Sequence, residues 1–235
     1  MTWSGKCYGK IPMMTPSKSC RDRLQPRDFH FLARVLTGRD DPGGLEGIFL
    51  DPENFDLLLD DNKVFHAVVD SPGPLGITPE LYFLVLVRKN LHRAGIHDSL
   101  VSDYVAGVLA GHAHGEPLAE RRERNPGVDF TYHLDFLKDL EGAGNYERFF
   151  LQVQCGNHFL WLSGLFPQFL QHRSLRRGAP DLRYYESVAR NAFLEARHHP
   201  LAVEFELDEV YRRLTDCFGE TRQALNLLAE NHLFL

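Results

Sequence analysis

Apolar residues recur at steps of three and four along most of the chain, which is the period of one face of an α-helix. The first such stretch begins at Pro26 and ends at Gly38. A second begins at Asp51-Pro52, because aspartate accepts hydrogen bonds from the free amides of a first turn and proline there has no amide to lose. Later helices are predicted at about 79–93, 98–112, 130–140, 181–198, 207–217 and 220–232, and a further long helix contains residues 155–166.

The most apolar run of the chain, residues 81–87, has the sequence LYFLVLV and fits either a buried strand or a helix enclosed on all sides. The residues that flank it favour the helix. Thr78 is a helix-capping residue, proline follows it, and four basic residues crowd the other end, where the helix dipole favours positive charge. Residues 62–70 stay ambiguous, because their valines suit a strand as well as a helix.

A second apolar centre is the run CGNHFLWLSGLFP at residues 155–167, where Cys155 and His158 stand three positions apart. A structural zinc site needs four ligands, usually in two close pairs, and no second cysteine pair exists in the chain. The surrounding apolar residues therefore favour a core helix that stops or kinks at Pro167. The small residues of the run would let a neighbouring helix come close: Gly156, Ser163 and Gly164.

These patterns predict an all-α protein, a single multi-helix globular bundle of roughly eight to ten helices with the two apolar runs at its centre. Residues 1–24 carry basic residues and prolines but no apolar period, so we expect a flexible basic leader. Residues 25–235 then form the helical domain. The polar segment 113–128 is interpreted as a loop within that domain.

Composition narrows the class of protein further. Apolar residues at 43% and charged residues at 25% are typical of a globular protein, and no apolar run approaches the roughly 20 residues that span a bilayer. The N-terminus lacks the continuous apolar core of a secretory signal, and the four cysteines form no CxxC pair. We therefore expect a cytoplasmic protein with reduced thiols and no membrane association.

Charge is unevenly distributed along the chain, whose net charge is −6. Residues 6–39 hold eight Lys or Arg and two Asp, whereas residues 40–61 hold eight Asp or Glu and no basic residue. The two segments can be solvated surfaces that attract each other, or the basic one can be an arm that reaches a partner. The net negative charge makes a general affinity for nucleic acid unlikely, since such affinity comes mainly from neutralising phosphates.

Twelve histidines are many for this length and raise a metal-site hypothesis. Glu195 and His198 have the Glu-x-x-His spacing that puts two ligands on one helix face, as in di-iron bundles, although such bundles need two of these motifs and the chain has one. His133 stands four residues after an aspartate and adds a further ligand. The candidate metal ligands are His133, His158, Glu195 and His198. Capping and surface roles explain the same residues without a metal.

Catalytic signatures do not support an enzyme. The chain has no GxSxG, no phosphate-binding GxxxxGK[ST], no GxGxxG and no HExxH, so the sequence predicts neither catalytic nor cofactor-binding residues. Tyr184, Tyr185, Glu186 and Arg190 suggest a ligand pocket. However, Tyr185 belongs to the apolar stripe of the predicted helix, and a surface pair four residues apart explains the last two. The basic leader at residues 1–24 and the basic clusters at 121–124 and 172–177 are candidates for contacts with nucleic acid.

Two segments resemble known sequences: ITPELYFLVLVRKNL at 77–91, and SGLFP at 163–167 followed by DLRYYESVARNAF at 181–193. They are similar to segments of an uncharacterised bacterial all-helical protein family with no established activity. The resemblance covers about half of the chain in short pieces. It implies a helical fold and a bacterial origin, and it assigns no catalytic residue.

Three functional hypotheses follow from the sequence. The leading one is a non-catalytic helical protein-interaction or regulatory module that binds a protein partner, with the basic N-terminal arm as one route to that partner. The second is an enzyme or sensor whose metal ion is held by His133, His158, Glu195 and His198. The third is a nucleic-acid-binding accessory factor. The oligomeric state stays open.

Overall fold

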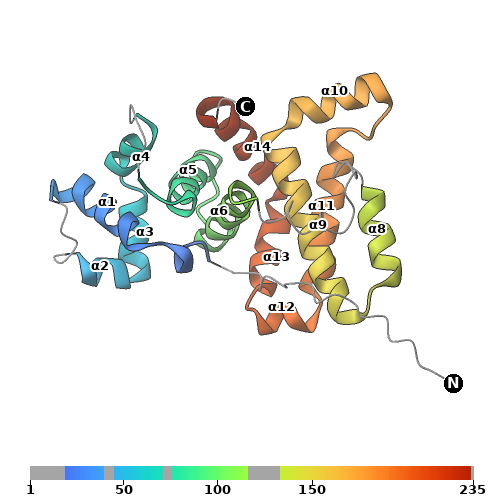
Figure 1. The fold of residues 1–235 in the computed structure, drawn as a ribbon, viewed down its shortest axis with the longest axis horizontal. Coiled ribbons are helices and arrows are strands. Elements are labelled where there is room, and N and C mark those ends of the chain that lie inside the picture. The colour runs from blue at the N-terminus through green and yellow to red at the C-terminus, as the bar shows by residue number, and fades with distance from the viewer. Residues whose placement is uncertain (1–18, 40–44, 71–75, 116–132, 234–235) are drawn as a thin grey trace, which may run out of the picture.

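The computed structural model describes residues 19–39, 45–70, 76–115 and 133–233, and this part of the chain is helical with no strand. Figure 1 shows the order of its elements. Thirteen α-helices are accompanied by a 3₁₀ turn, η1, and a terminal π-helical turn, η3. The elements are η1 (Arg21–Arg23), α1 (Pro26–Thr37), α2 (Glu46–Leu50), α3 (Pro52–Leu59), α4 (Asn62–Val69), α5 (Pro79–Arg93), α6 (Ser99–Ala113), α8 (His133–Gly142), α9 (Asn145–Leu165), α10 (Pro167–Arg177), α11 (Leu182–Arg197), α12 (Pro200–Glu204), α13 (Asp208–Asp216), α14 (Phe218–Leu228) and η3 (Ala229–Leu233).

The all-α prediction is confirmed, but the predicted count of eight to ten helices is too low for the described residues. The helices that the sequence pattern missed are α2, α10 and α12. Both α10 and α12 begin with a proline at the first helical position. A proline that ends one helix can also begin the next, because its fixed φ suits a first turn and its missing amide has no partner to lose there.

The helix starts that the sequence predicts from capping residues are present. Asp51 accepts a hydrogen bond from the amide of Asn54 at 2.8 Å at the start of α3, and Thr78 accepts one from Leu81 at 3.2 Å at the start of α5. The 12-residue helix α1 ends at Gly38, whose φ of 72° is left-handed and suits a residue without a side chain. The ambiguous segment 62–70 is helical, as α4.

The two apolar runs form the centre of the fold as helices α5 and α9. Residues 81–87 lie inside α5, and five of these seven side chains are buried. Helix α5 packs against α6 and α14, while α9 packs mainly against α11 and also against α14. In Figure 1, helices α1 to α4 lie at one end of the molecule, α5 and α6 in the middle, and α8 to α13 at the other end. Helix α14 therefore joins the two central helices.

Glycines let α9 approach its neighbours closely, as the sequence predicts. A Cβ atom built on Gly156 would lie 2.8 Å from two ring carbons of the buried Phe193 in α11. A Cβ on Gly164 would lie 2.8 Å from Cδ1 of the buried Leu225 in α14. Real Cβ atoms do not come that near, so both positions exclude any larger residue unless the partner moves.

The last six residues of the expected leader are part of the folded structure. Cys20 is buried, and Arg21 makes ion pairs with Asp56 of α3 and Asp103 of α6. Residues 19–24 therefore differ from the expected flexible leader, because their cations meet carboxylates of helices far along the chain. Residues 1–18, the rest of that leader, lie outside the described residues. So do residues 116–128 of the expected loop and residues 130–132 of the helix predicted at about 130–140.

Among the described helices, none combines the length and the apolar character that crossing a bilayer requires.

Candidate functional site

The four candidate metal ligands lie in different surroundings. His158 is buried on α9, whereas Glu195 and His198 are exposed at the end of α11. His133 begins α8, and its side chain lies outside the described residues. Within the described part of the chain, no three His, Cys, Asp or Glu side chains come together in a group that could hold a metal ion. The metal hypothesis therefore gains no support from the geometry and stays a prediction.

Cys155 and His158 are both interior residues of α9, in agreement with the core-helix interpretation. The His158 ring is surrounded by other rings from three helices. Its centroid lies 6.0 Å from that of Phe136 on α8, 5.9 Å from that of Trp161 on α9, and 6.4 Å from that of His112 on α6. These contacts join three helices through aromatic packing.

His112 and Trp161 form a stacked pair within this group, which we call the His112–Trp161 stack. The ring of His112 lies parallel to that of Trp161, with centroids 4.4 Å apart and planes 11° apart. Its Nδ1 lies 2.9 Å from the carbonyl oxygen of Val108, so Nδ1 carries the proton and donates it, and Nε2 is left as an acceptor. Burial lowers the pKa of His112 from its ordinary 6.5 to about 4. The imidazole is therefore neutral at pH 7.

This lowered pKa predicts a specific loss of stability in acid. The unfolded chain takes up a proton near pH 6.5 and the folded chain does so only near pH 4, so His112 stabilises the fold fully above pH 6.5 and progressively less down to pH 4. His112→Phe keeps a ring against Trp161 but cannot take up a proton. Between pH 7 and pH 4.5 we therefore expect the variant to lose about 2 kcal/mol less free energy of unfolding than the parent does. Denaturant titrations at pH 7 and pH 4.5 measure the free energy of unfolding.

Fluorescence of Trp161 in a Trp3→Phe background provides a local signal, since the chain has only two tryptophans. Burial also lowers the pKa of His92 and His232, so the variant should keep a smaller acid loss. An equal acid loss in the variant and the parent would contradict the role given to His112.

A network of ion pairs lies between η1, α3, α5 and α6. Arg88 is buried and its guanidinium binds two carboxylates: Nε and Nη2 donate to Asp60 at 3.0 and 2.9 Å, and Nη1 donates to Asp56 at 2.8 Å. Asp56 also pairs with Arg21, which in turn pairs with Asp103 at 2.7 Å. Each of these charged side chains has a partner of opposite sign within the chain, so the network has a structural role.

An open pocket of about 220 Å³ lies beside this network and is lined by Leu59, Asp60, Lys89, His92 and Arg93. Its polar groups are already engaged. Nζ of Lys89 donates to Oδ1 of Asn62 at 2.7 Å, and the Arg93 guanidinium lies over the ring of Phe65. Nδ1 of His92 lies 3.6 Å from Oδ1 of Asp60. The pocket therefore offers no cation that a ligand could take without breaking an existing contact.

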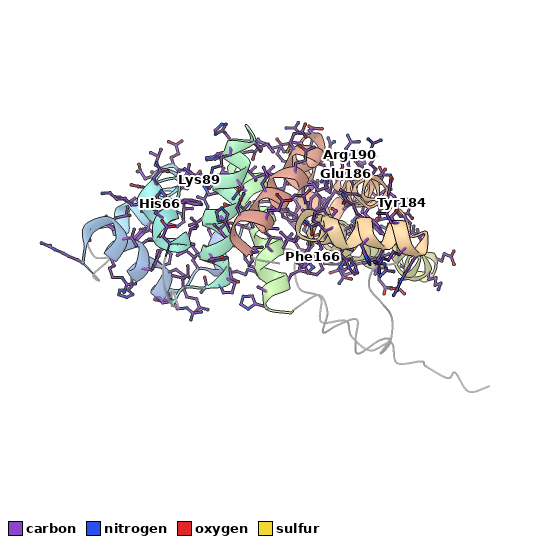
Figure 2. The ribbon with its side chains drawn as sticks, turned by 90° about the horizontal axis from the view of Figure 1, so that it is seen from above. His66, Lys89, Phe166, Tyr184, Glu186 and Arg190 are labelled. Carbon is purple, nitrogen blue, oxygen red and sulfur yellow. The ribbon has the colours of Figure 1, made fainter. Side chains whose placement is uncertain are left out.

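The suspected pocket at Tyr184, Glu186 and Arg190 is replaced by contacts between helices. Figure 2 labels these three residues in one half of the molecule and His66 and Lys89 in the other. Glu186 pairs with Arg222 of α14 at 2.7 Å, and Arg190 donates from Nε to the carbonyl oxygen of Thr215 at 2.9 Å. Both side chains fasten α11 to neighbouring helices, so the expected pair between Glu186 and Arg190 is not what they form.

The strongest candidate for contact with a partner is helix α10. Only Leu170 and Arg173 are buried on it, whereas Leu175 is 87% exposed and Phe169 is 44% exposed. Leu175 and Arg176 stand three and four positions after His172, so these three residues share the face of the helix that points away from the buried residues. We call the exposed set the α10 surface: Phe169, His172, Leu175, Arg176 and Arg177.

The charge of this region has one sign. No Asp or Glu occurs between Arg148 and Pro180 in the sequence, so every charged residue of α10 is basic, and the next acidic residue along the chain is Asp181. In Figure 1, α10 lies at one edge of the molecule. A basic helix with exposed apolar side chains is typical of a docking element for an acidic surface.

A second exposed apolar surface lies on α2 and α3. Leu50 is 84% exposed, Leu57 is 71% exposed and Ile48 is 36% exposed. Helix α2 is held from its other side by the Phe49 ring, whose centroid lies 5.1 Å from that of Phe29 and 6.1 Å from that of Phe55. The exposed set, which we call the α2–α3 surface, also includes two carboxylates: Ile48, Leu50, Asp51, Glu53 and Leu57.

The described residues thus define an all-α protein with exposed apolar side chains on α10, α2 and α3, among other helices. Comparison of the chain with models of known protein families, with curated proteins and with solved structures finds no match. The family resemblance drawn from residues 77–91, 163–167 and 181–193 therefore stays a prediction, and function is argued from the geometry alone.

The sequence singled out residues 172–177 for nucleic acid and missed Leu175 and Phe169 as contact residues. Their exposure depends on which face of α10 packs against α9 and α11, and no local pattern carries that information. The sequence carries a partial signal of this exposure. The segment 167–177 begins with a proline and contains four basic and no acidic residues, which leaves too few apolar residues to bury two faces of a helix.

Proposed function

We propose that the chain is a non-catalytic helical interaction module that binds a protein partner through the α10 surface. The observation that carries the proposal is the 87% exposure of Leu175 between the cations of α10. A single exposed leucine is ordinary. Leu175 differs because Phe169 is also exposed on the same short helix and every charge on that helix is positive.

The chemistry of the surface indicates the kind of partner. Burying one leucine side chain completely contributes about 1.5–3 kcal/mol, and exposed guanidinium groups favour carboxylates because they bind them with two hydrogen bonds. The partner that fits best is an apolar surface bordered by acidic residues. The cytoplasmic location and the bacterial origin expected from the sequence are part of the same proposal.

Nucleic acid is the alternative that the basic residues of α10 keep open. Binding to phosphates would need Arg176 and Arg177 but would not need Leu175. The two hypotheses therefore differ in the effect of a leucine substitution. A mobility-shift assay at about 150 mM salt, with the Leu175→Gln protein beside the parent, separates them.

A photo-activated cross-linking amino acid placed at position 175 tests the proposal directly. We expect it to form adducts with partner protein in cells of the source organism, and we expect Arg176→Glu with Arg177→Glu to reduce those adducts at least about tenfold by reversing the charge. The matched control carries the cross-linker at Glu195, which is also exposed but lies on α11. Mass spectrometry identifies the adducts.

The proposal fails if position 175 gives no adduct, or if the adducts at positions 175 and 195 are the same. Because Leu175, Arg176 and Arg177 are all exposed, these substitutions should leave the fold intact, and a circular dichroism melt checks that they do.

A further inference from the structure

The α2–α3 surface carries exposed carboxylates, whereas the charged groups of the α10 surface are cations. It presents Leu50 and Leu57 beside the carboxylates of Asp51 and Glu53, and the sequence contains no Lys or Arg between Leu45 and Asn62. The α10 surface presents Leu175 and Phe169 beside cations. We propose that the partner of α10 is the α2–α3 surface of a second copy of this chain. This inference rests on the proposed function, and it names the partner.

The carboxylates near this surface divide into two groups. Asp56 and Asp60 already form ion pairs within the chain: Asp56 with Arg88 and Arg21, and Asp60 with Arg88. Asp51 and Glu53 are exposed, and Asp51 uses one oxygen to cap α3. The exposed carboxylates therefore retain acceptor positions for guanidinium groups, so the exposed apolar side chains of the two surfaces have charges of opposite sign beside them.

The positions of the two surfaces exclude pairing within one molecule. Helices α2 and α3 lie at one end of the long axis, and α10 lies in the other half of the molecule, along the edge above α9 and α11 (Figure 1). A single contact between these unlike surfaces is heterologous, so a pair of copies leaves the α2–α3 surface of one copy and the α10 surface of the other open. The chain therefore forms head-to-tail oligomers that grow with concentration.

The association is weak and sensitive to salt. Each surface consists of short helices, which puts the contact at the small end of specific interfaces. Dissolved salt screens the attraction between exposed charges, with a screening length of about 10 Å at 0.1 M. The contact therefore weakens, and the average mass of the oligomers falls, as the salt concentration rises. Weak contacts of this kind suit reversible assembly.

Two single variants make the test sharp. Leu175→Glu removes the α10 surface, and Leu57→Lys removes the α2–α3 surface; both side chains are exposed, so both variants should fold. Val203→Lys on α12, where the side chain is 65% exposed, is the matched control. Sedimentation velocity of the full chain up to about 0.5 mM gives the average mass, and each of the two variants is expected to weaken self-association at least about tenfold.

Mixing is the decisive measurement. Each variant alone is expected to stay monomeric, whereas an equimolar mixture of the two forms one-to-one dimers and nothing larger, because each retains the surface that the other has lost. Val203→Lys should associate like the parent. The inference is overturned if the parent is monomeric at the highest concentration, if either variant associates like the parent, or if the mixture stays monomeric.

The cross-linking experiment separates this inference from the proposed function. Adducts from position 175 that map to residues 46–59 of a second copy support both. Adducts to a different protein overturn the self-association and leave the interaction module in place. The absence of adducts overturns both.

Discussion

Replacing Gly156 with valine is expected to destabilise the protein by about 3 kcal/mol. Gly156 lies on α9 where α11 comes closest, and even a single Cβ there would be 2.8 Å from Cε1 and Cζ of Phe193. The Phe193 ring is fully buried among Tyr104, Tyr211 and Phe218, so it has no free space to move into. The added side chain must therefore separate the two helices or distort the ring.

Urea unfolding followed by circular dichroism measures this effect as a shift in the midpoint at an unchanged slope. Gly142→Ala is the matched control, because a Cβ at Gly142 meets nothing within 4 Å and the residue ends helix α8. We expect this control to be neutral or slightly stabilising. A Gly156→Val protein as stable as the parent would contradict the close contact between α9 and α11.

Replacing Arg88 with methionine is expected to cost about 3 kcal/mol of folding free energy. The change keeps the length of the buried side chain but leaves Asp60 without the two hydrogen bonds that it accepts from the guanidinium. Asp56 keeps its pair with Arg21. The cost arises because the partly buried carboxylate of Asp60 loses the two charge-assisted hydrogen bonds that offset its desolvation.

A second substitution distinguishes lost pairing from lost packing. Arg88→Met combined with Asp60→Asn removes the unpaired charge, so the double variant should be more stable than Arg88→Met alone. Arg212→Met serves as a control, since Arg212 pairs with Glu209 on the exposed face of α13 and its loss should leave the unfolding midpoint nearly unchanged. Equal effects of Arg88→Met and Arg212→Met would contradict the structural role of the network.

Much of the fold can be predicted from the sequence because the signals for helix ends are local. Thr78 before Pro79 and the cations after residue 87 identify α5 as a helix despite its strand-like composition. Glycine at position 38 and aspartate at position 51 likewise mark ends that the structure contains. These residues act within one turn of the backbone, so the neighbouring sequence is sufficient.

The candidate site could not be predicted in the same way, because it depends on contacts between distant elements. Whether Leu175 is buried depends on how α10 sits on α9 and α11, and whether Arg21 is free depends on Asp103, 82 residues away. The metal candidates show the same limit. Glu195 and His198 share a helix, but His158 lies in the interior of another helix and no spacing rule brings them together.

Elemental analysis of purified protein tests the metal hypothesis independently of the interaction surface. The ligand set of His133, His158, Glu195 and His198 predicts about one metal ion per chain in protein prepared without chelators. The interaction module predicts that binding at position 175 persists after chelation. Loss of that binding on chelation would favour the metal-dependent enzyme or sensor over the non-catalytic interaction module.

Hydrogen exchange of the backbone amides of α10 is the measurement that tests the central claim most directly. The account predicts that the amides of residues 168–177 exchange quickly in dilute protein, since this helix is short and buries few side chains, and that their exchange slows when the partner is bound. Exchange in α8, which carries no part of the α10 surface, should stay the same in both states. If binding of the partner slowed amide exchange around Lys89 and Arg93 and left exchange in α10 unchanged, the α10 surface would not be the binding site.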